Sequence, residues 1–476
     1  MIVRHKHRQA LPSRARKQAV CFAGHLLLLS FPSFSADLLI RNVNIVDVKT
    51  GNILPHRSIL IHGDRIRSIT AATGPTRGAQ VVDGHNRYVI PGLWDMHVHL
   101  WYKEHQFPMF LAWGVTGVRD MGSDLAQVNR WRAQIKKHEL AGPHIETCGP
   151  SVDGFPSGDS KLPVLMVRNP NEARKTYDRL EQDLNVDFVN VLRRLPRDAY
   201  FALMERARKW GLPVTGAVPD SVTAEEAVAA RQSSMEHLTG IALACSREEH
   251  KLRPLLANAI ERKDAADLAN LAERVLDTYD PAKANTLFDR MHKFDSYQVP
   301  ALLKLRSLTY ADSSEVVREP RLKYIPAAIR KTWEDPRERE AKLSEEALEL
   351  ADREYQRNAY IVDQMQRFGV PIMAGTGTGD PYTFPGYDLH REMQLLVSAG
   401  LTSLQALRSA TLTPAEYLEA GDSLGTVAPG RMADLVLLDA DPLQDIRNTK
   451  KVAAVILGGR YLPKPTLDAM LLHARQ

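Results

Sequence analysis

The chain has little cysteine, which argues against a fold built on disulfide bonds. Only three cysteines occur in 476 residues: Cys21, Cys148 and Cys245. Cys21 falls within a predicted leader, and two remaining thiols are too few for the disulfide framework of a small secreted domain. We expect two ordinary thiols, with a Cys148–Cys245 pair left open.

The chain also lacks an excess of one charge once its N-terminus is set aside. It has 62 basic and 57 acidic residues, and the first 36 residues hold six of the basic ones and no acidic one. The remainder therefore has a formal net charge of −1, which gives no sign of a nucleic-acid partner. After residue 36 no apolar run reaches the ~20 residues needed to span a bilayer, so we expect no stable membrane span in the mature chain.

Residues 1–36 have the pattern of a signal peptide. The six basic residues precede the apolar run "AVCFAGHLLLLSFPSF", and small residues at 33–35 offer a cleavage site near Ala36. A membrane anchor is the alternative, but the run is short for a span. We predict an exported protein, periplasmic or secreted, after cleavage.

Both ends of the mature chain have the alternating pattern of short β-strands. Residues 38–70 alternate apolar and polar side chains and are broken by Thr50-Gly51-Asn52 and His62-Gly63-Asp64. A similar pattern returns over residues 422–462. We predict that 37–90 and 422–476 pair into one small β-sandwich domain.

The middle of the chain alternates short apolar runs with helical patterns, as parallel α/β sheets do. Eight strands are predicted within the ranges 88–100, 114–122, 144–150, 187–192, 213–219, 233–238, 297–305 and 370–379. The predicted fold class is α/β, a (β/α)₈ TIM-like barrel over residues 91–421. Two charged helical segments, around 247–292 and 312–367, are too long for ordinary connections and are predicted to form a helical cap.

The motif "PGLWDMHVHL" ends in His97-Val98-His99. Alternate residues of a strand point the same way, so both imidazoles are expected on one face. They also stand at the C-terminal end of the first predicted barrel strand, where barrel enzymes place their active sites. A His-x-His pair alone is weak evidence for a metal.

The surrounding sequence resembles the amidohydrolase superfamily, specifically its imidazolonepropionase-like and Xaa-Pro-dipeptidase-like branch. The resemblance rests on "VIPGLWDMHVHL", "FPGYDLHREMQLLVSAGLTSLQALRSATLTPAEYL" and "LGTVAPGRMADLVLLDADPLQDI", and it extends from about residue 38 to 463. It implies a metal-dependent hydrolase of C–N bonds on a barrel flanked by a β-sandwich. In its commonest form the family holds two divalent metals.

The resemblance implies six ligand positions, of which three match and three do not. His97 and His99 match the first-strand pair, and His237 in "SSMEHL" matches the sixth-strand histidine. Asn190 stands where the family has a carboxylated lysine, Ala217 replaces the fifth-strand histidine, and Gly377 replaces the eighth-strand aspartate. Because the flanking residues still match, we expect the register to be correct and the chemistry to be changed.

These replacements remove both of the family's anionic ligands. The three histidines that remain, His97, His99 and His237, are enough for at most one divalent ion, with zinc favoured, and the ion is left open. Asp380 and Asp120 are weak candidates for a general base. Asp380 alternatively shapes a turn before Pro381, and Asp120 alternatively pairs with Arg119 or caps a loop. His390 is either a substrate contact or, more in keeping with its helix start, a local structural bond.

Three interpretations remain open from the sequence. One is a hydrolase with a single metal on three histidines. The second is a non-catalytic descendant that binds a ligand or partner in the same pocket. The third is an ordinary two-metal enzyme altered at three ligand positions. We favour impaired or lost two-metal hydrolysis, acting on or binding a small molecule, with a homo-oligomer left open.

Overall fold

The computed structural model describes residues 37–71, 78–156, 162–309, 318–333 and 342–475. The predicted leader lies outside them and stays a prediction. Across the described part of the chain, no helix is both long enough and apolar enough to pass through a bilayer. Cys148 and Cys245 are both buried, and each is a free thiol.

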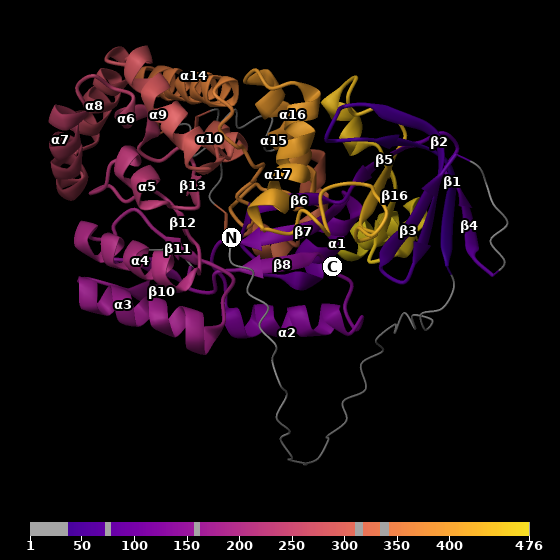
Figure 1. The fold of residues 1–476 in the computed structure, drawn as a ribbon. Helices are drawn as coiled ribbons and strands as arrows, with labels where there is room; N and C mark the ends of the chain where they lie inside the picture. The colour runs from indigo at the N-terminus through magenta and orange to yellow at the C-terminus, as the bar shows by residue number, and fades with distance from the viewer. Residues whose placement is uncertain (1–36, 72–77, 157–161, 310–317, 334–341, 476) are drawn as a thin grey trace, which may run out of the picture. The chain divides into compact units, whose positions relative to one another are not determined.

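Strands from residues 38–91 and 435–463 form one sheet (Figure 1). Its order is β17-β16-β15-β5-β1-β2-β3, and β4 also pairs with β1. Ile90 of β5 pairs with Val436 of β15, which joins the N-terminal and C-terminal segments directly. Gly51 has φ +80°, a left-handed conformation suited to the predicted turn. The strands are β1 Leu38–Val46, β2 Ile53–His62, β3 Arg65–Thr70, β4 Gln80–Asp83, β5 Tyr88–Pro91, β15 Leu435–Leu438, β16 Val452–Leu457 and β17 Arg460–Pro463.

Parallel strands make up the middle of the chain. One sheet has the order β6-β7-β8 and the other β10-β9-β11-β12-β13-β14. Residues 371–378 connect them: the N–H of Gln298 in β14 donates to Pro371 O (2.9 Å), and the N–H of Met96 in β6 donates to Ala374 O (2.9 Å). The strands are β6 Leu93–Val98, β7 Val115–Asp120, β8 His144–Thr147, β9 Ser151–Asp153, β10 Val164–Met166, β11 Val189–Val191, β12 Val214–Gly216, β13 Ser234–Glu236 and β14 Tyr297–Val299.

Helices follow most of these strands, and the mixed α/β class with parallel strands is confirmed. Helix α5 begins with a capping box in which Thr223 and Glu226 satisfy each other's backbone N–H groups. The helices between and after the strands are α1 Lys103–Ala112, α2 Leu125–Lys136, α3 Pro170–Asp178, η1 Arg179–Leu184, α4 Arg197–Trp210, α5 Ala224–Ala230, α15 Tyr387–Ser398, α16 Ser403–Ser409, α17 Leu412–Tyr417, η3 Ile446–Lys450 and α18 Lys464–His473.

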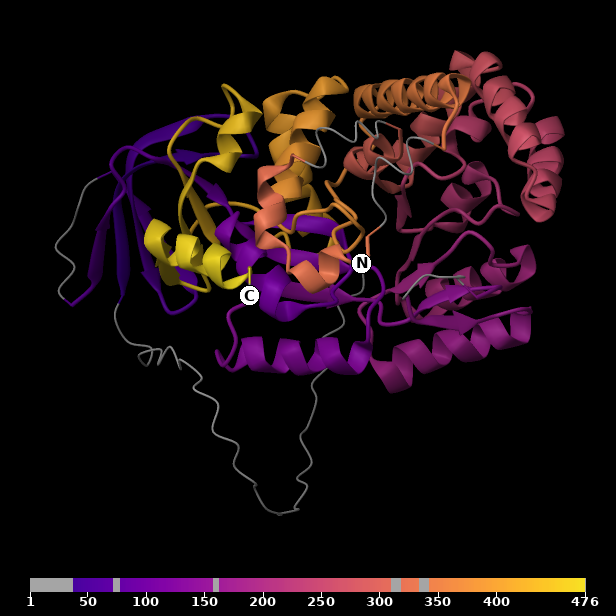
Figure 2. The same ribbon diagram turned by 180° about the vertical axis from the view of Figure 1, so that it is seen from behind.

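The two long insertions contain further helices. Figures 1 and 2 both show α8 lying beside α7 and beside the end of α14. Arg353 of α14 forms ion pairs with Glu273 (3.2 Å) and Asp277 (2.7 Å) of α8. The elements are α6 Ile241–Ala244, α7 Glu249–Arg262, α8 Ala265–Asp277, α9 Pro281–Lys293, α10 Leu302–Thr309, η2 Pro320–Tyr324, α12 Ala327–Arg330 and α14 Glu345–Arg367.

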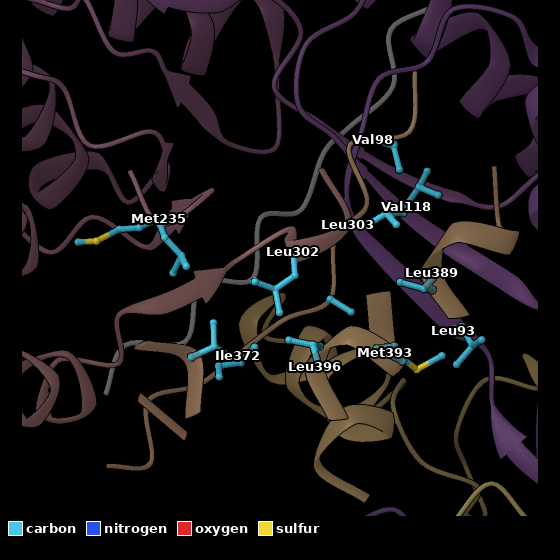
Figure 3. Close-up of a cluster of buried hydrophobic side chains, with 14 of the residues drawn as sticks. Leu93, Val98, Val118, Met235, Leu302, Leu303, Ile372, Leu389, Met393 and Leu396 are labelled. Carbon is cyan, nitrogen blue, oxygen red and sulfur yellow. The ribbon is translucent and has the colours of Figure 1, made fainter. Parts of the chain in front are cut away.

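The seventh predicted strand is only partly correct. Strand β14 ends at Val299, and α10 begins at Leu302. The carboxylate of Glu392, in α15, accepts the N–H groups of Leu302 (2.9 Å) and Leu303 (2.7 Å), which provides the helix start that the local sequence lacks. Leu302 and Leu303 also pack in the apolar cluster drawn in Figure 3, which fixes the start of α10 against the strands.

Candidate functional site

The two histidines of the His-x-His motif lie at the C-terminal end of β6. His97 and His99 are only 5% and 6% exposed, and their ring centroids are 5.5 Å apart. The N–H of His99 donates to Thr378 O (2.6 Å), and the N–H of Gly377 donates to His97 O (2.8 Å). The glycine-rich segment of residues 375–379 therefore packs directly against both histidines.

His237 joins this pair from the end of β13. Its ring centroid lies 4.4 Å from that of His97. His237 and Leu238 have φ +59° and +53°, a left-handed conformation that costs a non-glycine residue roughly 1–3 kcal/mol. His237 Nδ1 is buried without a hydrogen-bond partner. A strained backbone and an unpartnered ring nitrogen are typical of a functional site.

Burial keeps all three imidazoles neutral near pH 7. It lowers the pKa of His99 to about 4. Burial first, together with neighbouring positive charge that includes Lys304, holds the pKa values of His97 and His237 well below their usual range. Each ring therefore keeps one nitrogen able to accept a hydrogen bond and one able to donate.

A buried carboxylate orients His97. Glu236 Oε2 lies 2.8 Å from His97 Nδ1, and Glu236 Oε1 lies 2.7 Å from Arg119 Nη2. Arg119 is fully buried and also donates to Met96 O (2.8 Å) and Ser234 Oγ (2.9 Å). An Nδ1–H bond to a carboxylate directs His97 Nε2 away from Glu236. In the sequence, the one signal for Glu236 is that it precedes His237.

Asn190 belongs to the larger parallel sheet, and Ala217 is the residue that follows one of its strands. Asn190, in β11, is buried, and its side-chain amide donates to Met121 O (2.9 Å) and Ser151 Oγ (3.0 Å). Ala217 follows β12, and its N–H continues the ladder to Val191 O (3.0 Å). Both N–H groups of the Asn190 amide donate to neighbouring protein atoms, so this side chain has a structural role.

Gly377 lies against an ion pair that the sequence did not reveal. Lys304 Nζ is 2.7 Å from Asp380 Oδ2. A Cβ added at Gly377 would lie 3.2 Å from Lys304 Cδ and 3.6 Å from Asp380 Oδ2. Lys304 and Asp380 thus occupy the space beside the position where the family resemblance expects an aspartate. A lone lysine in the apolar run "YQVPALLKL" was the one sequence signal for this pair.

Asp380 shapes a turn, which is the structural alternative considered for it, and it also forms an ion pair. Its N–H donates to Gly377 O (3.2 Å), so it shapes the turn, and its carboxylate binds Lys304. Burial alone would raise the pKa of Asp380, but the charge and hydrogen bond of Lys304, together with His99 and His97, outweigh it and lower this pKa below its usual value. A carboxylate held in this way is a weaker proton acceptor than a free one.

Asp120 caps a loop and does not pair with Arg119. Its Oδ1 accepts from Ser123 Oγ (2.6 Å) and Leu100 N (3.3 Å), and its Oδ2 accepts from Thr147 Oγ1 (2.7 Å). The ion pair with Arg119 that the sequence suggested is wrong, because adjacent strand residues point to opposite faces and Arg119 instead reaches Glu236. Burial raises the pKa of Asp120 to about 6.

His390 makes local structural bonds with both ring nitrogens. Nδ1 lies 2.9 Å from Thr449 Oγ1, and Nε2 lies 2.9 Å from Trp113 O. The ring is fully buried in α15, and burial lowers its pKa to about 4. This geometry matches the structural alternative for His390 and leaves no ring nitrogen for a substrate.

Replacing His390 with glutamine should make the free energy of unfolding less dependent on pH in the acidic range. A histidine whose folded pKa is depressed contributes stability above its unfolded pKa of about 6.5, and this stability is lost as the pH falls towards about 4. Over that window, His390→Gln should lose up to about 3 kcal/mol less unfolding free energy than the wild type. Urea titrations at several pH values measure this, and parallel profiles for the two proteins would contradict it.

The residues present do not fit a two-metal centre. Among the residues that the structure describes, no group of three or more His, Cys, Asp or Glu side chains is arranged to hold a metal ion. The two carboxylates beside the histidines are already engaged, Glu236 by Arg119 and Asp380 by Lys304. Nothing among these residues offsets the charge of two divalent ions.

Comparison with known proteins places this architecture among the amidohydrolases. Residues 88–462 match the Amidohydrolase family. The chain is similar in structure to AH, the bottromycin amidohydrolase (TM-score 0.72, 22% identity, covering 92% of this chain and 90% of that one). It is also similar to a putative prolidase from Bifidobacterium longum (TM-score 0.65, 22% identity, covering 93% and 99%).

Curated relatives match over a short segment. Adenine deaminase 3 of Rhizobium meliloti (strain 1021) is 40% identical over 67 residues, which is 14% of this chain and 11% of that protein. The class defined by the parallel α/β fold and the family match is that of the amidohydrolase-type hydrolases. This chain belongs to the Amidohydrolase family.

Proposed function

We propose that the histidine cluster of this chain binds a small molecule bearing an amide or carboxylate group, and that the two-metal hydrolysis of the family is lost. One observation carries the proposal: Asp380, the carboxylate beside the replaced aspartate position, is held by Lys304 at 2.7 Å. A paired carboxylate with a lowered pKa is poorly suited to accept a proton from water.

The same groups suit the binding of carbonyl and carboxylate oxygens. His97 gives its one N–H to Glu236, and His99 Nδ1 faces Gly122 O at 3.3 Å, so His237 is the imidazole left to donate to a ligand oxygen. The Lys304 ammonium supplies a positive charge beside the cluster. His97 is held in place by Glu236, so its position costs little on binding. The site therefore offers an imidazole donor and an ammonium to a ligand oxygen, and its carboxylates are already paired.

Binding and hydrolysis assays test this proposal together. We expect the purified protein to bind L-pyroglutamate or N-acetyl-L-proline in calorimetry, and to release amine from neither. His237→Ala should weaken binding at least about tenfold, the size of one lost charge-assisted hydrogen bond. His473→Ala, at an exposed position of α18, is the control and should bind as the wild type does.

Two results would overturn the proposal. One is hydrolysis of either compound that stops when a chelator is added. The other is a failure of both compounds to bind.

A second candidate function is a hydrolase with one zinc on His97, His99 and His237. The buried Nδ1 of His237, which has no hydrogen-bond partner, favours it. A bound zinc would supply an activated water. About one equivalent of zinc in the purified protein, together with hydrolysis, would favour this candidate over the first.

A further inference from the structure

Lys304 is placed beside the histidine cluster by the fold around it. It lies in the first turns of α10, whose start is held by Glu392 and by the burial of Leu302 and Leu303. The helix therefore delivers the ammonium to a defined place next to the 375–380 segment. Its Cδ and Cβ lie 3.2 and 3.8 Å from the position of a Cβ on Gly377.

The segment that Lys304 contacts is itself bonded to the histidines. Gly377 N donates to His97 O, and Thr378 O accepts from His99 N. Asp380, at the end of the same segment, holds the ammonium at 2.7 Å. The same segment lies against the histidine side chains, because a Cβ added at Gly375 would lie 2.7 Å from His97 Cβ and one added at Gly379 would lie 2.8 Å from His99 Cβ.

We propose that the Lys304 ammonium, held by Asp380, occupies the place of a metal ion beside the histidines. In this position it keeps divalent cations from binding to the three imidazoles. Lys304 then adds a charge barrier beside three imidazoles that are not arranged around a common ion in the described structure. Zinc binding by a Lys304 variant therefore also requires these rings to turn toward one point. A divalent ion among the histidines would lie beside the ammonium of this pair, and its attraction to Asp380 would have to compete with the existing pair.

This inference rests on the proposed function and extends it, because it explains how the site does without a metal. The two remain separable. Zinc binding by a Lys304 variant tests only the exclusion of cations, whereas ligand binding by the wild type tests only the proposed function.

Zinc binding to the apo-protein, followed by equilibrium dialysis and elemental analysis, tests the exclusion. We expect the wild type to bind well below one equivalent. Lys304→Met, which removes the charge and keeps most of the volume, should bind about one equivalent, at least about 100-fold more tightly. Cobalt(II) provides a second readout, because four-coordinate cobalt on histidines absorbs visible light much more strongly than hexaaqua cobalt does.

Three further variants complete the design. Lys293→Met removes another ion-paired lysine, on the surface at 2.7 Å from Asp289, and should bind no more zinc than the wild type. Lys304→Met combined with His237→Ala should lose the gain. Lys304→Ala removes charge and volume together, and it provides a second test should the methionine variant fold poorly.

Three outcomes of these zinc measurements would contradict the inference. If the wild type binds one equivalent as tightly as Lys304→Met, the ammonium excludes nothing and the inference is wrong. It is also wrong if neither Lys304 variant gains zinc. A gain in Lys304→Ala alone, with the methionine variant folded, would assign the effect to volume and overturn the role of charge.

Discussion

Replacing Arg119 with methionine is expected to lower the free energy of unfolding by about 3–5 kcal/mol. The guanidinium is fully buried and bonds Glu236, Ser234 and Met96, and it packs against the Tyr417 and Phe188 rings at 5.0 and 5.6 Å. The loss is large because the substitution leaves the Glu236 carboxylate buried and unpaired. Urea denaturation followed by circular dichroism measures it.

Two controls separate this explanation from a general packing defect. Combining Arg119→Met with Glu236→Gln removes the uncompensated charge and should recover at least about 1 kcal/mol of the loss. Arg174→Met breaks the exposed pair with Glu205 (3.1 Å) and should cost less than about 1 kcal/mol. A double variant as unstable as the sum of its single variants would show that no charge was left unpaired.

The fold could be predicted because its signals are local and repeated. Alternating residues at both ends indicate strands, which pair as Ile90 with Val436, and the rhythm of apolar runs indicates the parallel α/β middle. The boundary of the seventh strand was missed for a non-local reason. The carboxylate that starts α10 belongs to Glu392, 90 residues beyond Leu302.

The candidate site was also only partly predictable from the sequence, because some of its contacts are local and others are not. His97 and His99 could be placed together because strand periodicity fixes their common face. The partners that decide the chemistry come from distant elements: Glu236 reaches His97 from β13, and Lys304 reaches Asp380 from α10. No spacing rule connects these residues, so the sequence pointed to the missing ligands but not to the lysine beside them.

Restoring the three replaced ligands alone is expected not to rebuild a two-metal centre. Asn190→Lys, Ala217→His and Gly377→Asp together return the side chains that the family resemblance implies, but Lys304 remains. The Cβ that Gly377→Asp introduces would stand 3.2 Å from Lys304 Cδ, at a φ of +72° that few side chains adopt. The restored carboxylate would therefore pair with the ammonium, and we expect at most about one zinc per chain.

Adding Lys304→Ala to those three changes should give about two zinc ions per chain and a large gain in amide hydrolysis. With the ammonium gone, the restored aspartate is free to bind metal and to accept a proton from the attacking water. The quadruple variant should therefore hydrolyse N-acetyl-L-proline roughly 100-fold or more faster than the triple variant. Elemental analysis and amine release measure the two effects on the same preparations. A triple variant that already binds two zinc ions and hydrolyses as fast as the quadruple variant would show that Lys304 is no obstacle. Because Lys304→Ala alone restores no ligand, it should gain zinc without gaining this activity, which separates the exclusion of cations from the loss of the family's anionic groups.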